Sequence, residues 1–262
     1  MDILLLKLLL APLLVVTSTL AGRRWGPAAT GMLIALPIVA GPILYIVYEE
    51  HGSEFAGEAA GAALLGLVSL AVFAVVFTRV ARRFGGLATL AASWAAVLAV
   101  DVALSFYRVP DPVALATTLA ATAVATLFMP RTDRDRDVEP PPPPIWDLPG
   151  RAVATVILVV SITTASGLLG PQWTGILAPF PIATSVVAAF VLAQDGAAAA
   201  ARLLSGVLIG LFGFATFCFS VAVLVRPFGA IAFILGSATA VATQIVVVRL
   251  RRRRRPAPRD TA

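Results

Sequence analysis

The sequence predicts an all-α, polytopic membrane protein with about nine transmembrane helices, and three observations support this fold class. Of the 262 residues, 59% are hydrophobic and 13% are charged, whereas an ordinary soluble domain is about 25% charged. The mean hydropathy is +0.94. Long apolar segments follow one another along the chain, and roughly 20 apolar residues suffice to cross a bilayer. Together these observations exclude a water-soluble globular protein.

Each apolar segment is a predicted span. The nine segments lie at about 3–20, 28–48, 58–80, 86–106, 112–129, 152–168, 173–193, 203–225 and 229–248. The first could be taken for a signal peptide, but a signal peptide carries basic residues before its apolar part. Here Asp2 precedes the run and Lys7 lies inside it. We therefore expect this segment to stay in the protein as a span.

Basic residues are distributed unequally between the connecting segments. If the chain crosses nine times, Lys7, Arg108 and Arg226 fall on one side, and the other 17 of the 20 basic residues fall on the opposite side. In membrane proteins, Arg and Lys are enriched in cytoplasmic loops. We therefore expect a multi-pass protein whose N-terminus lies outside and whose C-terminus lies in the cytoplasm.

Segment 130–150 is predicted to be a solvated cytoplasmic linker. Arg and Asp alternate between Arg131 and Asp137, and five consecutive prolines follow at Pro140–Pro144. This composition cannot bury apolar surface and favours an extended chain. A docking site for a proline-binding partner is the alternative to a plain spacer.

The two halves of the chain contain a repeated segment. Gly26-Pro-Ala-Ala-Thr-Gly recurs 144 residues later as Gly170-Pro-Gln-Trp-Thr-Gly, and 22 of the 72 residues of 26–97 are identical to their counterparts. Each copy holds four predicted spans, so the unpaired span 112–129 between them forces the second copy to insert upside down. Inverted repeats are the common plan of secondary carriers, whose site lies where the halves meet.

The repeat divides the chain into five parts. They are a first four-helix repeat (1–106), a linker transmembrane helix (107–129), the charged and Pro-rich linker (130–150), a second, inverted four-helix repeat (151–249) and a basic cytoplasmic tail (250–262).

A short apolar motif occurs once in each half. Gly31-Met-Leu-Ile-Ala-Leu-Pro37 and Gly175-Ile-Leu-Ala-Pro-Phe-Pro181 follow the pattern Gly-Leu/Ile-x-x-x-Phe-Pro, although Leu36 replaces the aromatic residue in the first copy. In this pattern each half resembles the small four-span GlpM-type bacterial inner-membrane proteins. That family is associated with exopolysaccharide production. The resemblance implies a bacterial inner-membrane location and a fused pair of such units.

The second and seventh spans are the predicted binding site. Proline removes a helix hydrogen bond, and the freed backbone groups are tolerated in lipid only against protein or a watery cavity. Interrupted helices at equivalent positions of inverted halves therefore indicate a site. The candidate substrate-binding residues are Thr30, Gly31, Pro37, Thr174, Gly175 and Pro181. The alternative is that the prolines only kink packed helices and the glycines allow close helix contact.

Asp101 is the one acidic residue deep inside a predicted span. An intramembrane carboxylate is costly and suggests coupling to a proton or another cation. The alternative is a structural pair with Arg108, seven residues later on the same helical face.

The basic cluster Arg251–Arg255 directly follows the last predicted span. This juxtamembrane position favours membrane lipids with anionic headgroups as partners, and we expect no nucleic-acid binding.

These patterns favour a membrane transporter or lipid-flippase-like carrier that moves a small apolar, amphipathic or lipid-linked solute by alternating access. The alternative is a non-transporting scaffold or accessory subunit for envelope polymer (exopolysaccharide) biosynthesis. An enzyme is not expected, because the sequence has no phosphate loop, zinc-ligand spacing or paired carboxylates. With one Cys and one His in the chain, we expect no metal site and no cofactor. The cargo and the oligomeric state, including a homo-oligomer, stay open.

Overall fold

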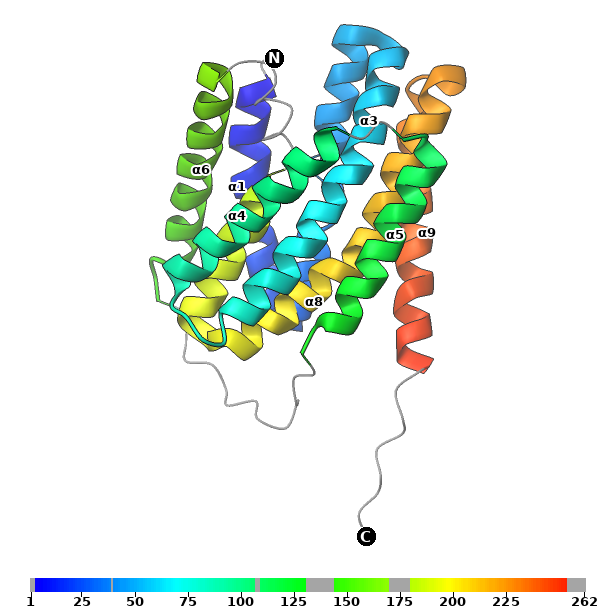
Figure 1. Ribbon diagram of the computed structural model, residues 1–262. Coiled ribbons are helices and arrows are strands. Elements are labelled where there is room, and N and C mark those ends of the chain that lie inside the picture. The colour runs from blue at the N-terminus through cyan, green and yellow to red at the C-terminus, as the bar shows by residue number, and fades with distance from the viewer. Residues whose placement is uncertain (1–2, 39, 107–108, 131–143, 170–179, 254–262) are drawn as a thin grey trace.

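The computed structural model describes residues 3–38, 40–106, 109–130, 144–169 and 180–253, and every regular element within them is an α-helix (Figure 1). The helices are α1 (Ile3–Trp25), α2 (Pro27–Ile34), α3 (Ala40–Val80), α4 (Gly86–Ser105), α5 (Asp111–Phe128), α6 (Asp147–Leu169), α8 (Ile182–Phe228) and α9 (Ile231–Arg253). The predicted all-α class is therefore confirmed for the described part of the chain.

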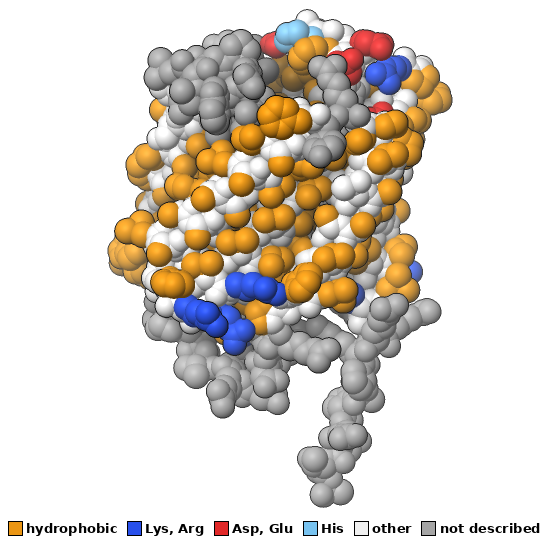
Figure 2. Space-filling model, in the orientation of Figure 1, with side chains coloured by type: hydrophobic (Ala, Val, Ile, Leu, Met, Phe, Trp, Pro, Cys, Tyr) orange, Lys and Arg blue, Asp and Glu red, His pale blue; other side chains and the backbone are white. Residues whose placement is uncertain are grey.

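Five of the described helices, α3, α4, α5, α8 and α9, are long and apolar enough to cross a membrane. Large apolar side chains also cover the outer surface, with Leu87, Phe106 and Leu127 each more than three-quarters exposed. Figure 2 shows hydrophobic side chains spread over the face in view between the two charged ends. A surface of this kind requires an apolar surrounding. The chain is therefore a membrane-embedded protein.

Two of these helices, α3 with 41 residues and α8 with 47, are much longer than one crossing requires. Each contains one glycine with positive φ: Gly52 (φ 83°) in α3 and Gly196 (φ 82°) in α8. Residues that carry a Cβ rarely adopt a positive φ, so a glycine is needed at each bend. In Figure 1 the two bends lie at opposite ends of the molecule. The predicted spans 58–80 and 203–225 thus form the longer arms of two bent helices.

The predicted second span, 28–48, is interrupted. Pro27 begins α2, where a missing backbone N–H costs nothing, and α2 ends at Ile34. Pro37 follows in a non-helical segment because it lacks a backbone N–H and cannot continue the helix. Gly41 N donates a hydrogen bond to Pro37 O at 2.8 Å as α3 begins.

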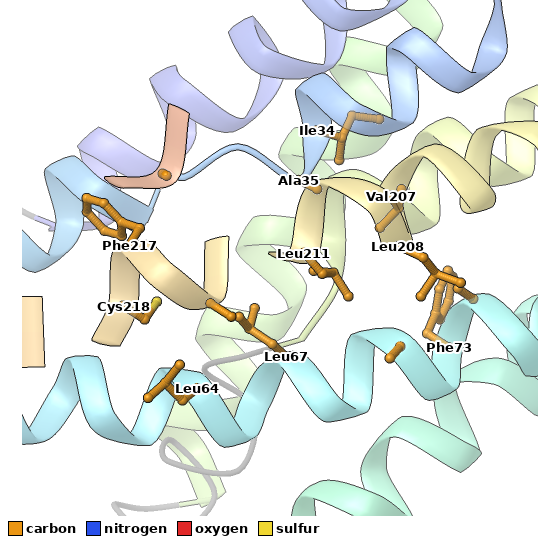
Figure 3. Close-up of a cluster of buried hydrophobic side chains, with 14 of the residues drawn as sticks. Ile34, Ala35, Leu64, Leu67, Phe73, Val207, Leu208, Leu211, Phe217 and Cys218 are labelled. Carbon is orange, nitrogen blue, oxygen red and sulfur yellow. The ribbon is translucent and has the colours of Figure 1, made fainter. Parts of the chain in front are cut away.

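Helix α8 occupies the centre of the bundle and packs against α2, α3 and α9. Figure 3 shows Leu67 and Phe73 of α3 facing α8. Ile34 and Ala35, at the end of α2, lie against α8 near Val207 (Figure 3). Phe73, Leu208 and Leu211 are fully buried. The core therefore joins helices from both halves of the sequence.

Charged side chains gather at the two ends of the molecule (Figure 2). At one end, called the acidic end here, α3 bends at Gly52, and Glu49, Glu50, Glu54 and Glu58 all lie within six residues of this bend (Figure 1). Arg226 belongs to this end, because its Nε lies 3.3 Å from Glu54 Oε1. The arginines that follow α3, Arg82 and Arg83, are exposed at the opposite end.

Candidate functional site

An apolar groove of about 450 Å³ begins at the interruption between α2 and α3. It is lined by Pro37, Gly41, Pro42, Tyr45, Ile46, Phe217, Phe233 and Ser237. This volume lies within the ≈ 300–1,000 Å³ range of ligand pockets. We call it the Pro37 groove.

The walls of the Pro37 groove come from both halves of the chain. Residues 37–46 belong to the first half, whereas Phe217 of α8 and Phe233 and Ser237 of α9 belong to the second. Ser237 Oγ donates to Phe233 O at 2.8 Å, so this hydroxyl is already bonded within its own helix. The groove thus presents mainly hydrocarbon and aromatic surface, which suits an apolar chain.

A second, polar pocket of about 320 Å³ lies next to the groove at the acidic end. It is lined by Tyr48, Glu49, Gly52, Ser53, Val225, Arg226 and Gly229. Three rings mark the boundary between the two cavities: the Phe233 ring centroid lies 5.3 Å from that of Tyr45 and 6.0 Å from that of Tyr48. We call this cavity the Arg226 pocket.

Thr30 and Gly31 lie at a tight contact between α2 and α8. A Cβ on Gly31 would overlap Leu203 O and lie 2.7 Å from Val207 N. From the other side, a Cβ on Gly206 would overlap Ala28 O. Thr30 is buried beside Gly22 of α1. These two predicted site residues therefore serve a close helix contact in this conformation, and Pro37 is the one of the three first-half residues that lines the groove.

In the second half, Thr174 and Gly175 lie outside the described residues. Pro181 is buried and directly precedes α8. Nearby, Trp94 of α4 donates from Nε1 to Ser185 Oγ at 3.0 Å, and its ring contacts Phe180 edge-on with centroids 5.5 Å apart. A tryptophan from α4 thus packs against the start of α8.

Asp101 is buried in α4, with 6% of its surface exposed. One carboxylate oxygen accepts a hydrogen bond from Ser69 of α3. The other oxygen has no hydrogen-bond partner among the described residues. Arg108, the partner considered from sequence, lies outside the described residues. Both interpretations of Asp101 stay predictions.

A buried polar cluster joins α1, α6 and α8 at the arginine-rich end. Arg151 Nε and Gln194 Nε2 each donate to Asp147 Oδ1 at 2.7 Å, and Arg23 Nη2 donates to Asp147 Oδ2 at 2.9 Å. The Asp147 and Arg151 side chains are only 1% and 3% exposed. Sequence reasoning used Arg151 and Arg23 only as markers of orientation. The i,i+4 spacing of Asp147 and Arg151 was the available signal.

The electrostatics of this cluster favour a charged carboxylate. Asp147 lies before the predicted span 152–168. Its burial acts to raise the pKa of the carboxyl, but hydrogen bonds from Arg151, Gln194 and Arg23 outweigh burial, so the pKa is lowered from its usual value. The Arg151 guanidinium also lies 5.0 Å from the Phe190 ring centroid. The arrangement holds three helices together without an open site.

The described residues contain no group of three or more His, Cys, Asp or Glu that could hold a metal ion. Of the basic cluster Arg251–Arg255, α9 includes the first three residues, and the Arg251 side chain is exposed. Comparison of the chain with models of protein families, with curated proteins and with solved structures finds no match.

Proposed function

We propose that this protein is a carrier in the bacterial cytoplasmic membrane that moves a small apolar, amphipathic or lipid-linked solute by alternating access. The observation that carries the proposal is the Pro37 groove. It starts at a proline-interrupted helix and has walls from both halves of the chain. Sites of secondary carriers are built from discontinuous helices where two repeats meet.

Helix bounds support the division into two inverted repeats. Helix α1 (Ile3–Trp25) and α6 (Asp147–Leu169) are offset by 144 residues at both ends (147 − 3 and 169 − 25). The bend glycines Gly52 and Gly196 have the same offset and nearly the same φ and ψ angles. Their position at opposite ends of the molecule agrees with an inverted second copy (Figure 1).

A difference between the two halves supports alternating access. At the 144-residue offset, Gly41, which lines the groove, corresponds to Ser185, and Ala238, which follows the lining residue Ser237, corresponds to Trp94. Trp94 Nε1 donates to Ser185 Oγ at 3.0 Å, whereas the counterpart residues Ala238 and Gly41 are small. The groove side thus has small residues at positions whose counterparts include a hydrogen-bonded tryptophan. This is the asymmetry expected of a carrier open towards one side.

The working site is therefore the Pro37 groove, with Pro37 and Pro181 as the related prolines of the two copies. Thr30 and Gly31 belong to the contact of α2 with its neighbours, which must rearrange when access changes, whereas their counterparts Thr174 and Gly175 lie outside the described residues. We assign Asp101 a coupling role for a proton or cation, because one buried carboxylate oxygen has no partner among the described residues. The tail at Arg251–Arg255 contacts anionic lipid headgroups.

A transport assay in proteoliposomes tests the proposal. Ser237→Leu and Gly41→Leu place a larger apolar side chain in the groove, whereas Ala120→Leu adds the same side chain on an exposed position of α5. We expect the two groove variants to reduce uptake of apolar and amphipathic solutes at least tenfold. Ala120→Leu should transport like the parent protein.

Correctly inserted groove variants with unchanged uptake would refute the carrier assignment. If the parent protein moves none of the solutes and instead copurifies with proteins of envelope-polymer synthesis, the scaffold alternative replaces it.

A further inference from the structure

The Pro37 groove and the Arg226 pocket adjoin, and we propose that together they bind one amphipathic molecule: a single hydrocarbon chain with a zwitterionic headgroup that pairs an oxyanion with an ammonium group. This inference rests on the proposed carrier function and names its substrate class. The hydrocarbon chain would lie in the groove, and the headgroup would lie in the pocket at the acidic end.

The polarity of the two cavities changes at one level of the molecule. Tyr45 and Phe233 line the groove, and Tyr48 and Gly229 line the pocket. The rings of Tyr45, Tyr48 and Phe233 are mutually within 6.1 Å. Tyrosine rings are typical of the boundary between hydrocarbon and headgroups. The boundary between the cavities therefore matches the point where a lipid changes from chain to headgroup.

Arg226 supplies the positive charge for the oxyanion. Its Nε lies 3.3 Å from Glu54 Oε1, and its side chain is 44% exposed. A guanidinium has five N–H donors in a planar fork, which suits a phosphate oxygen. Within the part of the chain that the structure describes, this ion pair engages Nε and leaves the two Nη groups of the fork for a ligand in the pocket.

The carboxylates at the acidic end decide between headgroup classes. Glu49 lines the pocket with Arg226, and Glu54 contacts the Arg226 guanidinium. Arg226 therefore stands against these two carboxylates, and Glu50 and Glu58 add further negative charge at the acidic end. A headgroup with a net negative charge would be repelled, and an ammonium group would be attracted by the carboxylates. A zwitterionic headgroup satisfies both signs of charge.

Binding is tested on the purified full chain in detergent by native mass spectrometry with three single-chain probes of equal chain length. The probes are a lysophosphatidylethanolamine, a lysophosphatidylglycerol and a primary alkylamine. We expect the lysophosphatidylethanolamine to bind at least tenfold more tightly than either of the others. Equal affinity for the three probes, or tighter binding of the phosphatidylglycerol form or of the amine, would overturn the proposal.

Variants locate the site. Arg226→Gln should lower affinity for lysophosphatidylethanolamine to that of the amine, and Ser237→Leu should remove binding of all three probes. Arg82→Gln is the matched control, because Arg82 is the exposed counterpart of Arg226 at an offset of 144 residues and lies at the opposite end. Unchanged binding in Arg226→Gln, or equal loss in Arg82→Gln, would contradict the assignment.

The two proposals fail separately. If Ser237→Leu abolishes transport of an uncharged apolar solute but the three probes bind equally, the headgroup assignment fails and the carrier stands. If lysophosphatidylethanolamine binds selectively but nothing is transported, the site stands and the carrier function fails.

Discussion

Individual residues in this protein make sharply different electrostatic contacts. Asp147 and Arg151 form a buried ion pair, whereas Glu54 and Arg226 form an exposed one, with side-chain exposures of 78% and 44%. Breaking a buried pair leaves an uncompensated charge away from water, and breaking an exposed pair does not. The two pairs therefore give a matched comparison within one chain.

Replacement of Asp147 by alanine is expected to destabilise the protein by about 3–5 kcal/mol, because Arg151 would stay buried without its carboxylate. Glu54→Ala should cost at most about 1 kcal/mol. Thermal unfolding of the detergent-purified variants, followed by intrinsic fluorescence, measures both effects. Similar melting temperatures for the two variants would contradict a buried, stabilising pair.

Asp101 differs from both pairs, because it is a buried carboxylate whose hydrogen-bond donor, Ser69, is neutral. Ser69 donates to one of its oxygens. At the 144-residue offset its counterpart is Ile245, so whatever Asp101 does belongs to the first half alone. This asymmetry is compatible with a coupling role in which one half changes its protonation while the other does not.

Helices α2 and α8 pack so closely that there is no room for a side chain at the predicted site residue Gly31. Gly31 of α2 and Gly206 and Gly210 of α8 all lie where a Cβ would meet the other helix. Small residues allow helices to approach closely in membranes, where packing rather than water exclusion drives association. The short helix α2 is therefore held by the shape of α8.

Gly31→Ala tests this contact. Its added methyl group would overlap Leu203 O, so we expect a loss of about 1–3 kcal/mol from overpacking. Gly86→Ala is the control, since Gly86 begins α4 with open space where a methyl group would lie, and its φ is not positive. Melting temperatures of both variants provide the measurement. A Gly31→Ala protein as stable as Gly86→Ala would mean that α2 moves away from α8 at little cost.

At the scale of the whole molecule, the two ends differ in charge and the middle is apolar. Glu49, Glu50 and Glu54 gather at one end with Arg226, and Arg82 and Arg83 lie at the other (Figure 2). Because basic residues are retained in the cytoplasm, the arginine-rich end is the proposed cytoplasmic end. The Arg226 pocket then opens towards the outside.

Labelling with a membrane-impermeant thiol reagent in intact cells tests this orientation. In a Cys218→Ala background, which removes the single cysteine of the chain, Glu50→Cys should react and Asp135→Cys should react only after the cells are opened. The lysed-cell sample is the control for reactivity. A reversed pattern would overturn the orientation and would place the Arg226 pocket at the cytoplasmic face.

Several features were predictable because they depend on composition and local chemistry. Apolar segments of about 20 residues must form helices in lipid, since each backbone polar group needs a partner within its own segment. The interruption near Pro37 was also predictable, because proline stops a helix wherever the chain folds. The number of nine crossings and the inverted repeat stay predictions from the same sequence.

Contacts between distant residues were decided only by the tertiary structure. Pro37 shares a groove with Phe217 and Phe233, and no local pattern relates positions so far apart in an apolar chain. Gly31 packs on the backbone of α8, and the sequence left this close contact open as the alternative to a role in the site. By itself the sequence determined the helical class, the apolar surface and the break near Pro37, because these follow from each segment's own hydrogen bonding and hydropathy. Which break opens a cavity depends on the side chains that a partner helix brings to it, and only packing in three dimensions decides that.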